Sequence, residues 1–388
     1  MPSVASDYNA TECPISLPPE LLLHIFSFLS TASGSIVAQV SKRFNILVTP
    51  LVWTSIKLSD LFKAHQYLAT CSLLGSQHDL LSMVRSFEIE LLALSVRNCS
   101  LMAEHAAAEG VEELLPKILD WMQNLEHFRF VSERWAFQGD FILDMVGHKS
   151  VLKSLKLDLA AFLLCGDTIS AANLPNLETL YLTANCASVG GRIQNWISNL
   201  VDDHTALIND FQIHGIRPEK IIPNNDDSWS SLQTLRIACS GLYMPYALKM
   251  PHVKQLSIPV PYLNGRNRDP VTPVPPIFPD LEVLRALPET VMRSGLLKGR
   301  PIHTLELDDI HLYEDDGVYS AGVGRVAPEN ETLANIFHQL KESSTPLRSL
   351  SFLMKALQID FLLHCLMPFK HLRYLKLMIS VGWLVCVI

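Results

Sequence analysis

Charged residues are scarce in this chain. Of its 388 residues, 18% are Asp, Glu, Lys or Arg, whereas globular domains average roughly a quarter. Apolar residues make up 48%, so the chain can bury an extensive core and does not belong to the disordered class. Its length suffices for about two or three domains, or for one domain followed by an elongated array of repeats.

The chain also lacks the signals that would direct it into a membrane or out of the cell. No apolar run reaches the roughly 18 residues of a membrane-spanning helix, and residues 1–10 contain no basic segment followed by an apolar one. No two of the eight cysteines lie within four residues of each other, which excludes a CxxC motif. We therefore expect reduced thiols and a cytoplasmic or nuclear location. The net charge of −8 disfavours general binding to nucleic acid.

Motifs of common catalytic sites are missing. The sequence contains no GxSxG, GxxxxGK[ST], GxGxxG or HExxH pattern. His303 and His311 lie near acidic residues between Asp308 and Asp316, which could form a metal cluster or a solvated acidic loop. We favour the loop, and we expect a protein that is not an enzyme and that holds no cofactor and no metal.

An apolar concentration near the N-terminus, Leu17–Leu29, predicts a short helix. Pro18 and Pro19 suit a first helical turn, where a missing N–H costs nothing, and the macrodipole favours the charge of Glu20 there. Apolar residues cover most of the circumference, so the helix must be buried on more than one side. Because little of the chain lies nearby in sequence to cover it, we expect another protein to complete the burial.

The following residues complete a recognisable pattern. Ser33–Ser35 predicts a break before a second helical run, Ile36–Val40. The order and spacing of the residues from Leu17 to Trp53 resemble the F-box family, whose pattern reads roughly LPxEL, IFxxL, V(C/S)(K/R)R followed by an apolar residue, and PxLW. Ser41 and Phe44 stand where the family commonly has Cys and Trp. The positions that match are Leu17, Pro18, Glu20, Leu21, Ile25, Phe26, Leu29, Val40, Lys42, Arg43, Leu51 and Trp53.

The resemblance implies a partner and a role. Residues 14–55 would form a small all-α F-box domain that binds the Skp-family adaptor of a Skp–cullin–F-box ubiquitin ligase. The chain would then be a non-catalytic substrate receptor, joined to the cullin through that adaptor. The residues that would make or shape the adaptor contact are Leu17, Pro18, Leu21, Leu22, Ile25, Phe26, Leu29, Val40, Phe44 and Trp53.

A six-residue phrase, apolar-x-x-apolar-x-apolar, recurs through the rest of the chain. From Leu125 to Ile302 its starts are 21 to 31 residues apart, near the period of leucine-rich repeats. In a strand, the fourth and sixth residues of the phrase would face a core and the third and fifth would face solvent. Eleven phrases begin at Val84, Leu125, Leu152, Leu177, Ile208, Leu232, Val253, Leu281, Ile302, Leu347 and Leu372.

Between the phrases, several segments have helical periodicity, among them residues 111–123, 140–148 and 333–342. A strand, a helix and a parallel strand one step along predict an α/β fold, a curved solenoid with a parallel sheet on its concave face. This pattern resembles the degenerate leucine-rich repeats that often follow an F-box. We expect a helical linker or cap at residues 56–83 and the solenoid at residues 84–388.

The fifth residues of the phrases include several cations. Neighbouring parallel strands lie about 4.8 Å apart, so Arg129 and Lys156 would be close enough to repel each other. The charges could favour an acidic or phosphorylated protein segment, or could simply be long side chains that cover the sheet. The residues that we expect to contact a substrate are Arg129, Lys156, Tyr181, Arg236 and Arg285.

Two further points stay open. The apolar tail, Ile379–Ile388, either folds back as one more strand or marks a truncated or altered end, and we favour the second explanation. The chain could also be a repeat scaffold outside any ligase, in which the F-box-like segment only caps the first repeat. The identity of the substrate does not follow from the sequence.

Overall fold

A computed structural model provides the structure of the chain. It describes residues 17–73, 78–91, 101–132, 134–163, 172–184, 191–216, 222, 228–238, 248–258, 277–307, 330–341, 343, 345–354, 358–379 and 382–386. The loop that contains His311, the cluster Asp308–Asp316 and the end of the tail lie outside these residues.

Three helices form the N-terminal part: α1 (Pro19–Phe26), α2 (Thr31–Ala38) and α3 (Lys42–Thr54). Their starts follow from local chemistry, because Pro19 occupies the first turn of α1 and serine side chains cap the other two helices. Ser30 accepts a hydrogen bond from the backbone N–H of Ser33, and Ser41 accepts one from that of Phe44. Leu22, Phe26 and Val48 are the buried centre of this bundle.

The predicted break at Ser33–Ser35 is wrong, because α2 runs through all three residues. The reason is tertiary packing. A Cβ atom on Gly34 would lie 3.0 Å from Cγ2 of Val52 in α3, so glycine here permits close contact between the two helices. Glycine is a weak helix former, but its lack of a side chain serves packing at this position.

A thirteen-stranded sheet follows, and its strands lie in the order of the sequence except for two short strands outside it. Every neighbouring pair is parallel except the last, β14 and β15. The strands are β1 (Ser55–Leu58), β2 (Ser86–Leu91), β3 (His127–Ser132), β5 (Ser154–Asp158), β7 (Thr179–Thr183), β8 (Asp210–His214), β9 (Thr234–Ala238), β10 (Gln255–Ile258), β11 (Val283–Ala286), β12 (Thr304–Leu307), β13 (Ser349–Met354), β14 (Tyr374–Ile379) and β15 (Gly382–Cys386).

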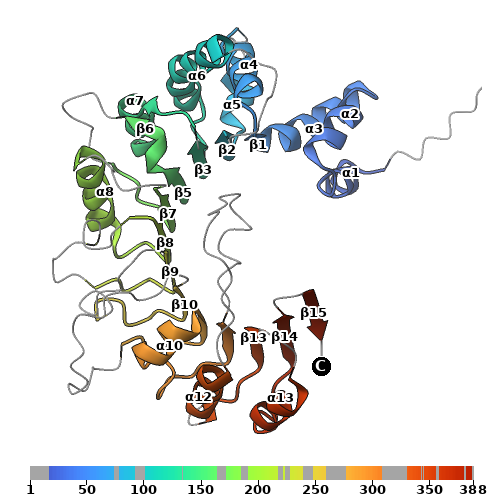
Figure 1. Cartoon of the computed structure of the whole chain (residues 1–388). Coiled ribbons are helices and arrows are strands. Elements are labelled where there is room, and N and C mark those ends of the chain that lie inside the picture. The colour runs from blue at the N-terminus through green and yellow to red at the C-terminus, as the bar shows by residue number, and fades with distance from the viewer. Residues whose placement is uncertain are drawn as a thin grey trace, which may run out of the picture.

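The strands follow an arc and the helices lie on its outer side (Figure 1). Two parallel neighbouring strands must be joined by a crossover connection, which usually contains a helix. The short strands β4 (Phe137–Gln138) and β6 (Phe162–Leu163) pair with each other. The outer helices are α4 (Leu61–Leu73), α5 (His78–Ser82), α6 (Leu101–Trp121), α7 (Gly139–Gly147), α8 (Gly191–His204), α10 (Pro288–Ser294), α12 (Asn330–Lys341) and α13 (Ile359–Leu366), and a 3-10 turn spans Leu159–Ala161.

All eleven predicted strands are present, and each begins at the third residue of its phrase. The parallel sheet is thereby confirmed. The helices predicted at residues 111–123, 140–148 and 333–342 are confirmed as α6, α7 and α12. The first residues of the phrases are buried, apart from the partly buried Leu372. Alternation therefore places apolar residues on the helix-covered face and polar residues on the inner face of the arc.

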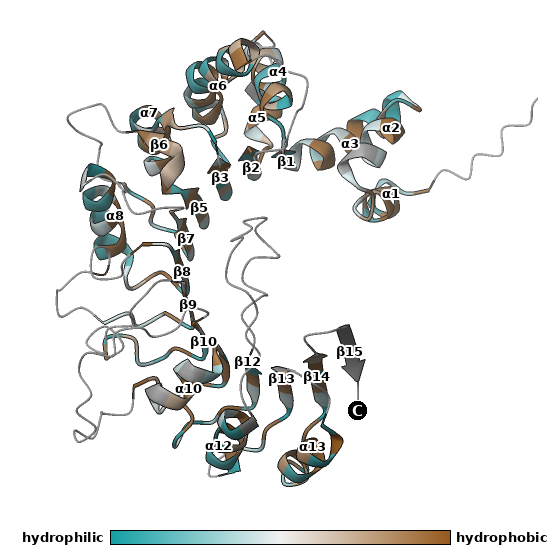
Figure 2. Cartoon of the chain, viewed as in Figure 1, coloured by the Kyte–Doolittle hydropathy of each residue, from teal (hydrophilic) through white to brown (hydrophobic). Residues whose placement is uncertain are grey.

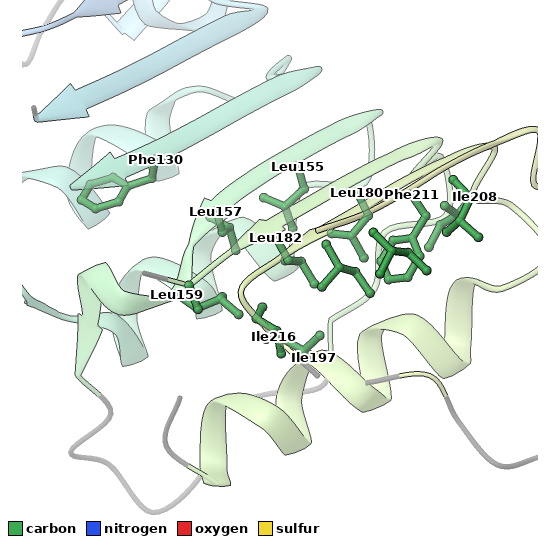
Figure 3. Close-up of a cluster of buried hydrophobic side chains, with 14 of the residues drawn as sticks. Phe130, Leu155, Leu157, Leu159, Leu180, Leu182, Ile197, Ile208, Phe211 and Ile216 are labelled. Carbon is green, nitrogen blue, oxygen red and sulfur yellow. The ribbon is translucent and has the colours of Figure 1, made fainter. Parts of the chain in front are cut away.

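The core lies between the sheet and the outer helices. Figure 3 shows Leu155, Leu157 and Leu182 of neighbouring strands directed toward Ile197 of α8. These four side chains are at most 1% exposed. One continuous cluster of buried residues extends from Ile56 to Leu377, so the repeated units share a single core.

One strand lies where we expected a helical linker. β1 belongs to a twelfth phrase, Trp53-Thr54-Ser55-Ile56-Lys57-Leu58, which has the same spacing as the other eleven. Its register continues theirs, because Ile56 pairs with Phe87 of β2. The sheet therefore begins at Ser55, and only the later part of the expected linker, in α4 and α5, is helical.

The C-terminal tail forms the last strand. β15 pairs antiparallel with β14, with Leu377 opposite Leu384. The tail therefore folds back as one more strand, which is the explanation that we did not favour.

Candidate functional site

The N-terminal helices expose an unusual number of apolar side chains. Helix α1 uses Leu22 and Phe26 for the internal core, where the ring of Phe26 packs edge-on against Phe44 with 5.2 Å between centroids. Its remaining apolar residues are left outside: Leu21 is 50% exposed and Ile25 is 48% exposed. An eight-residue helix with apolar residues on both sides can bury only one side within so small a bundle.

Apolar exposure extends beyond α1. Phe28, in the turn after the helix, is 77% exposed. Helices α2 and α3 and the turn between them add Ile36, Val40 and Ile46, and Figure 2 shows apolar residues along these helices. Exposed apolar patches on soluble proteins mark sites of interaction. The exposed set is Leu17, Leu21, Leu23, Ile25, Phe28, Leu29, Ile36, Val40 and Ile46.

The entry into α1 is tied to α3. Arg43 donates a hydrogen bond from Nη2 to the carbonyl oxygen of Leu17 at 2.7 Å. Leu17 precedes the helix by two residues, so this bond places the start of α1 over α3. This hydrogen bond therefore helps to hold α1, with its exposed residues, in place on the helical bundle.

Residues 15–59 match the F-box-like family model. The chain carries an F-box-like domain. The matched segment runs past α3 and includes β1, so the F-box-like domain and the sheet share a strand. No curated protein matches the chain.

The structure divides the predicted adaptor residues into groups. Leu17, Pro18, Leu21, Ile25, Leu29 and Val40 are exposed on the F-box-like domain. Leu22 and Phe26 are buried in its core, and Phe44 packs against that core. Trp53 instead packs against the core of the sheet, with its ring 6.2 Å from that of Tyr67. Four further residues are exposed but were not predicted as contacts: Leu23, Phe28, Ile36 and Ile46.

The second candidate surface is the inner face of the sheet. The fifth residues of the phrases pair in register from β1 to β14 and form one row across the sheet, which we call the inner row. The inner row is Lys57, Glu88, Arg129, Lys156, Tyr181, Gln212, Arg236, Ser257, Arg285, Glu306, Ser351 and Lys376.

At its start the inner row carries no net charge once Glu90 of β2 is counted with it. Nζ of Lys57 lies 2.8 Å from Oε2 of Glu90 and 3.6 Å from Oε2 of Glu88. Nε of Arg129 lies 2.9 Å from Oε1 of Glu90, and the Arg129 side chain is only 10% exposed. The expected repulsion between Arg129 and Lys156 is thus offset by Glu90, which the sequence phrase did not include.

A second ion pair neutralises the row farther along. Nε of Arg285 in β11 lies 3.0 Å from Oε2 of Glu306 in β12, its partner in register. Two of the five residues predicted to contact a substrate, Arg129 and Arg285, therefore have carboxylate partners within the sheet. The other three, Lys156, Tyr181 and Arg236, lie between them on β5, β7 and β9.

Among the residues that the structure describes, the two cations at the middle of the row have no carboxylate partner. Nζ of Lys156 lies 5.8 Å from the ring centroid of Tyr181, a cation–π contact. Within the described part of the chain, Arg236 forms no ion pair and no side-chain hydrogen bond, and it is only partly buried. Gln212, between these residues, donates from Nε2 to both oxygens of Asp210 at 3.2 and 3.3 Å.

The edge of the sheet where the strands begin contains charges that sequence analysis missed. The second residues of the phrases form a backbone ladder there; for example, the N–H of Lys153 donates to the carbonyl oxygen of Glu126. Glu126 also pairs with Arg85 and Lys153, each at 2.7 Å. The hydrogen bond from Lys153, together with the two positive charges, holds the pKa of Glu126 below its usual value. The sequence could have predicted these ion pairs, because the second residues of successive phrases alternate in charge, as in Arg85, Glu126 and Lys153.

A polar cavity of about 740 Å³ opens at this same edge, beside β7, β8 and β9. Glu178, Asn209, Gln233 and Lys254 line it. None of its lining residues belongs to the inner row. Among the described residues, no three metal-ligating side chains gather, and no helix is long and apolar enough to cross a membrane.

Proposed function

We propose that this chain is a non-catalytic substrate receptor of a Skp–cullin–F-box ubiquitin ligase. Its F-box-like domain would bind a Skp-family adaptor, and the sheet would receive a protein substrate. The observation that carries the proposal is the set of exposed apolar side chains on a domain that matches the F-box-like family. Such side chains gain free energy when a partner covers them, at roughly 25 cal/mol per Å² removed from water.

The proposal treats the repeated strand units as degenerate leucine-rich repeats. The regular phrase, the parallel sheet and the outer helices support this assignment. A stack of such units offers an extended inner surface, on which a substrate can be held while other subunits supply the chemistry. Catalysis would then arise from proximity between the substrate lysine and an activated thioester, without a reacting group from this chain.

A cytoplasmic or nuclear location is part of the proposal. Cys71 and Cys365, on α4 and α13, are buried and free, which agrees with a reducing compartment. Burial also raises the pKa of both thiols, so that neither is activated as a nucleophile.

The test is co-purification with the Skp-family adaptor. Charging the exposed face with Leu21→Asp and Ile25→Asp should abolish binding, because two carboxylates would be buried without partners. The matched control is Ile359→Asp with Leu363→Asp, on α13, where the two side chains are 61% and 57% exposed. That control should bind normally. Retention of the adaptor by the Leu21/Ile25 variant, with unchanged circular dichroism, would refute the adaptor role.

One structural observation favours a second candidate, a repeat scaffold that the F-box-like domain merely caps. Helix α3 leads directly into β1, the first strand of the sheet, and Trp53 packs against the sheet core. The domain thus covers the first unit, as terminal caps of repeat proteins do. Binding of the adaptor without a cullin in the purified complex, or no binding of the adaptor at all, would favour the scaffold.

A further inference from the structure

We infer that the inner face of the sheet at β5–β9 binds an extended acidic segment whose two anionic side chains are about four residues apart. This inference deepens the proposed function, on which it rests, because it specifies the substrate class for the surface that would receive the substrate. The residues that carry it are Lys156, Tyr181, Gln212 and Arg236, which we call the central row.

The residues of the central row pair in one register across neighbouring strands. Lys156 pairs with Tyr181, Tyr181 with Gln212, and Gln212 with Arg236 in the register of four consecutive strands. Strands are about 4.8 Å apart, so three steps separate the backbone positions of the two cations by about 14 Å. A ligand that contacts both must therefore cross the strands and reach about this far.

The two cations of the central row, Lys156 and Arg236, have no carboxylate partner among the described residues, whereas Lys57, Arg129 and Arg285 each have one. Glu90 neutralises Arg129 on one side, and Glu306 neutralises Arg285 on the other. Lys156 contacts the Tyr181 ring, and Arg236 has neither an ion pair nor a side-chain hydrogen bond in the described part of the chain. These two cations, on β5 and β9, are therefore available to an anionic ligand.

The spacing selects an extended segment. An extended chain rises about 3.4 Å per residue, so residues four apart are separated by about 14 Å, the distance between the two cations. Because side chains alternate between faces, residues at i and i+4 point the same way. In a helix the same two residues would lie only about 6 Å apart, so a spacing of four residues fits the two cations in an extended segment and not in a helical one.

The middle of the row specifies what lies between the anions. Gln212 uses its amide nitrogen for Asp210, and its Oε1 has no hydrogen-bond partner among the residues described, so it can accept a backbone N–H of the segment. The carboxylate of Asp210 lies beside this position. A third acidic residue at i+2 would approach that carboxylate and weaken binding through like-charge repulsion.

The test measures binding of labelled nine-residue peptides to the full chain by fluorescence anisotropy at low salt. The probe carries Glu at i and i+4, and a second probe carries phosphoserine at both positions, which distinguishes carboxylate from phosphate recognition. A peptide with Glu at i and i+3 keeps the charge but places the two side chains on opposite faces. We expect the i,i+4 peptides to bind about tenfold more tightly than the i,i+3 peptide, since one charge-assisted contact is lost.

Protein variants locate the contact. Arg236→Gln and Lys156→Gln should each weaken binding about tenfold, because each removes one charged donor. Arg285→Gln is the matched control, since Glu306 already pairs with that guanidinium. Lys254→Gln, at the edge where the strands begin, controls for net charge. Circular dichroism of each variant confirms the fold. Equal binding of the two spacings, equal binding by Arg236→Gln and wild type, or no binding of either i,i+4 probe would overturn the inference.

The adaptor is absent from this assay, so the two proposals fail separately. Failure of the peptides with normal adaptor co-purification would overturn the central row as the acidic site and leave the adaptor role standing. If the chain does not bind the adaptor but still binds the peptides with the expected dependence on spacing, the acidic site stands and belongs to a repeat scaffold outside the ligase.

Discussion

Arg43 and Leu17 connect two helices of the F-box-like domain through one hydrogen bond, 2.7 Å from Nη2 to the carbonyl oxygen. The bond joins α3 to the residues before α1, whose exposed leucines are proposed to meet the adaptor. A bond at the surface contributes little to overall stability, but this one orients a binding segment.

Removal of this bond should therefore affect binding more than folding. We expect Arg43→Ala to lower the free energy of unfolding by about 1 kcal/mol and to weaken adaptor binding severalfold. Lys42→Ala, one residue earlier at the start of α3, is the control. Calorimetric titration with the adaptor measures the effect, and equal affinity of the two variants would contradict the role of Arg43.

Arg300 should matter for stability alone. It is 5% exposed and donates hydrogen bonds to the carbonyl oxygens of Ile277, Gly295 and Lys298. Burial lowers the pKa of its guanidinium, which has three backbone acceptors around it. Arg300→Met would leave those carbonyls unsatisfied, and we expect a loss of about 3 kcal/mol in urea unfolding. Arg373→Met, on the surface, should change it by less than about 0.5 kcal/mol.

Glu126 should make stability depend on pH. Its folded-state pKa is lowered, mainly by the hydrogen bond from Lys153, so its contribution is present above the unfolded-state pKa of about 4.3 and is lost as pH falls through the folded value. We expect Glu126→Gln to be less stable than wild type at pH 7 by up to about 1 kcal/mol, because the group is near solvent. The difference should shrink below about pH 4. A difference that stays constant from pH 7 to pH 3 would contradict this.

Gly110 and His65 should be coupled. Gly110 lies inside α6, and a Cβ atom there would overlap the imidazole ring of His65 on α4. We expect Gly110→Ala to destabilise the wild type because the ring must move. In a His65→Ala background the same change should stabilise the protein by about 1 kcal/mol, since alanine is the better helix former. A double-mutant cycle by thermal unfolding measures the coupling, and additive effects would show that the two residues are independent.

Much of the fold could be predicted from short stretches of sequence. The phrase beginning at Leu177 places Leu180 and Leu182 in a strand whose apolar side faces α8, and the structure forms it there. Such a strand can be predicted from its own sequence, because the alternation of apolar and polar residues is local and does not depend on distant residues. β1 carried the same phrase, but the phrase straddles the boundary that we expected between the F-box at residues 14–55 and a helical linker at residues 56–83.

The candidate sites were only partly predictable. The exposed face of α1 follows from the excess of apolar residues in Leu21–Leu29, since a small bundle cannot bury both sides of a helix. The sequence does not show in this way which charged side chains of the sheet have an ion-pair partner. Glu90 and Arg129 are neighbours only because β2 and β3 pair in one register, and that pairing places Glu90 within reach of the guanidinium.

The sequence alone thus determined where the strands lie, which of their faces is apolar, and that an apolar helix near the N-terminus lacks cover, because each of these depends on the periodicity of adjacent residues. Tertiary structure decided that Gly34 belongs to a helix, that Trp53 packs against the sheet core, and that Arg236 lacks a carboxylate partner among the described residues while Arg129 has one. These outcomes depend on contacts between residues far apart in the chain, and local periodicity carries no information about such contacts.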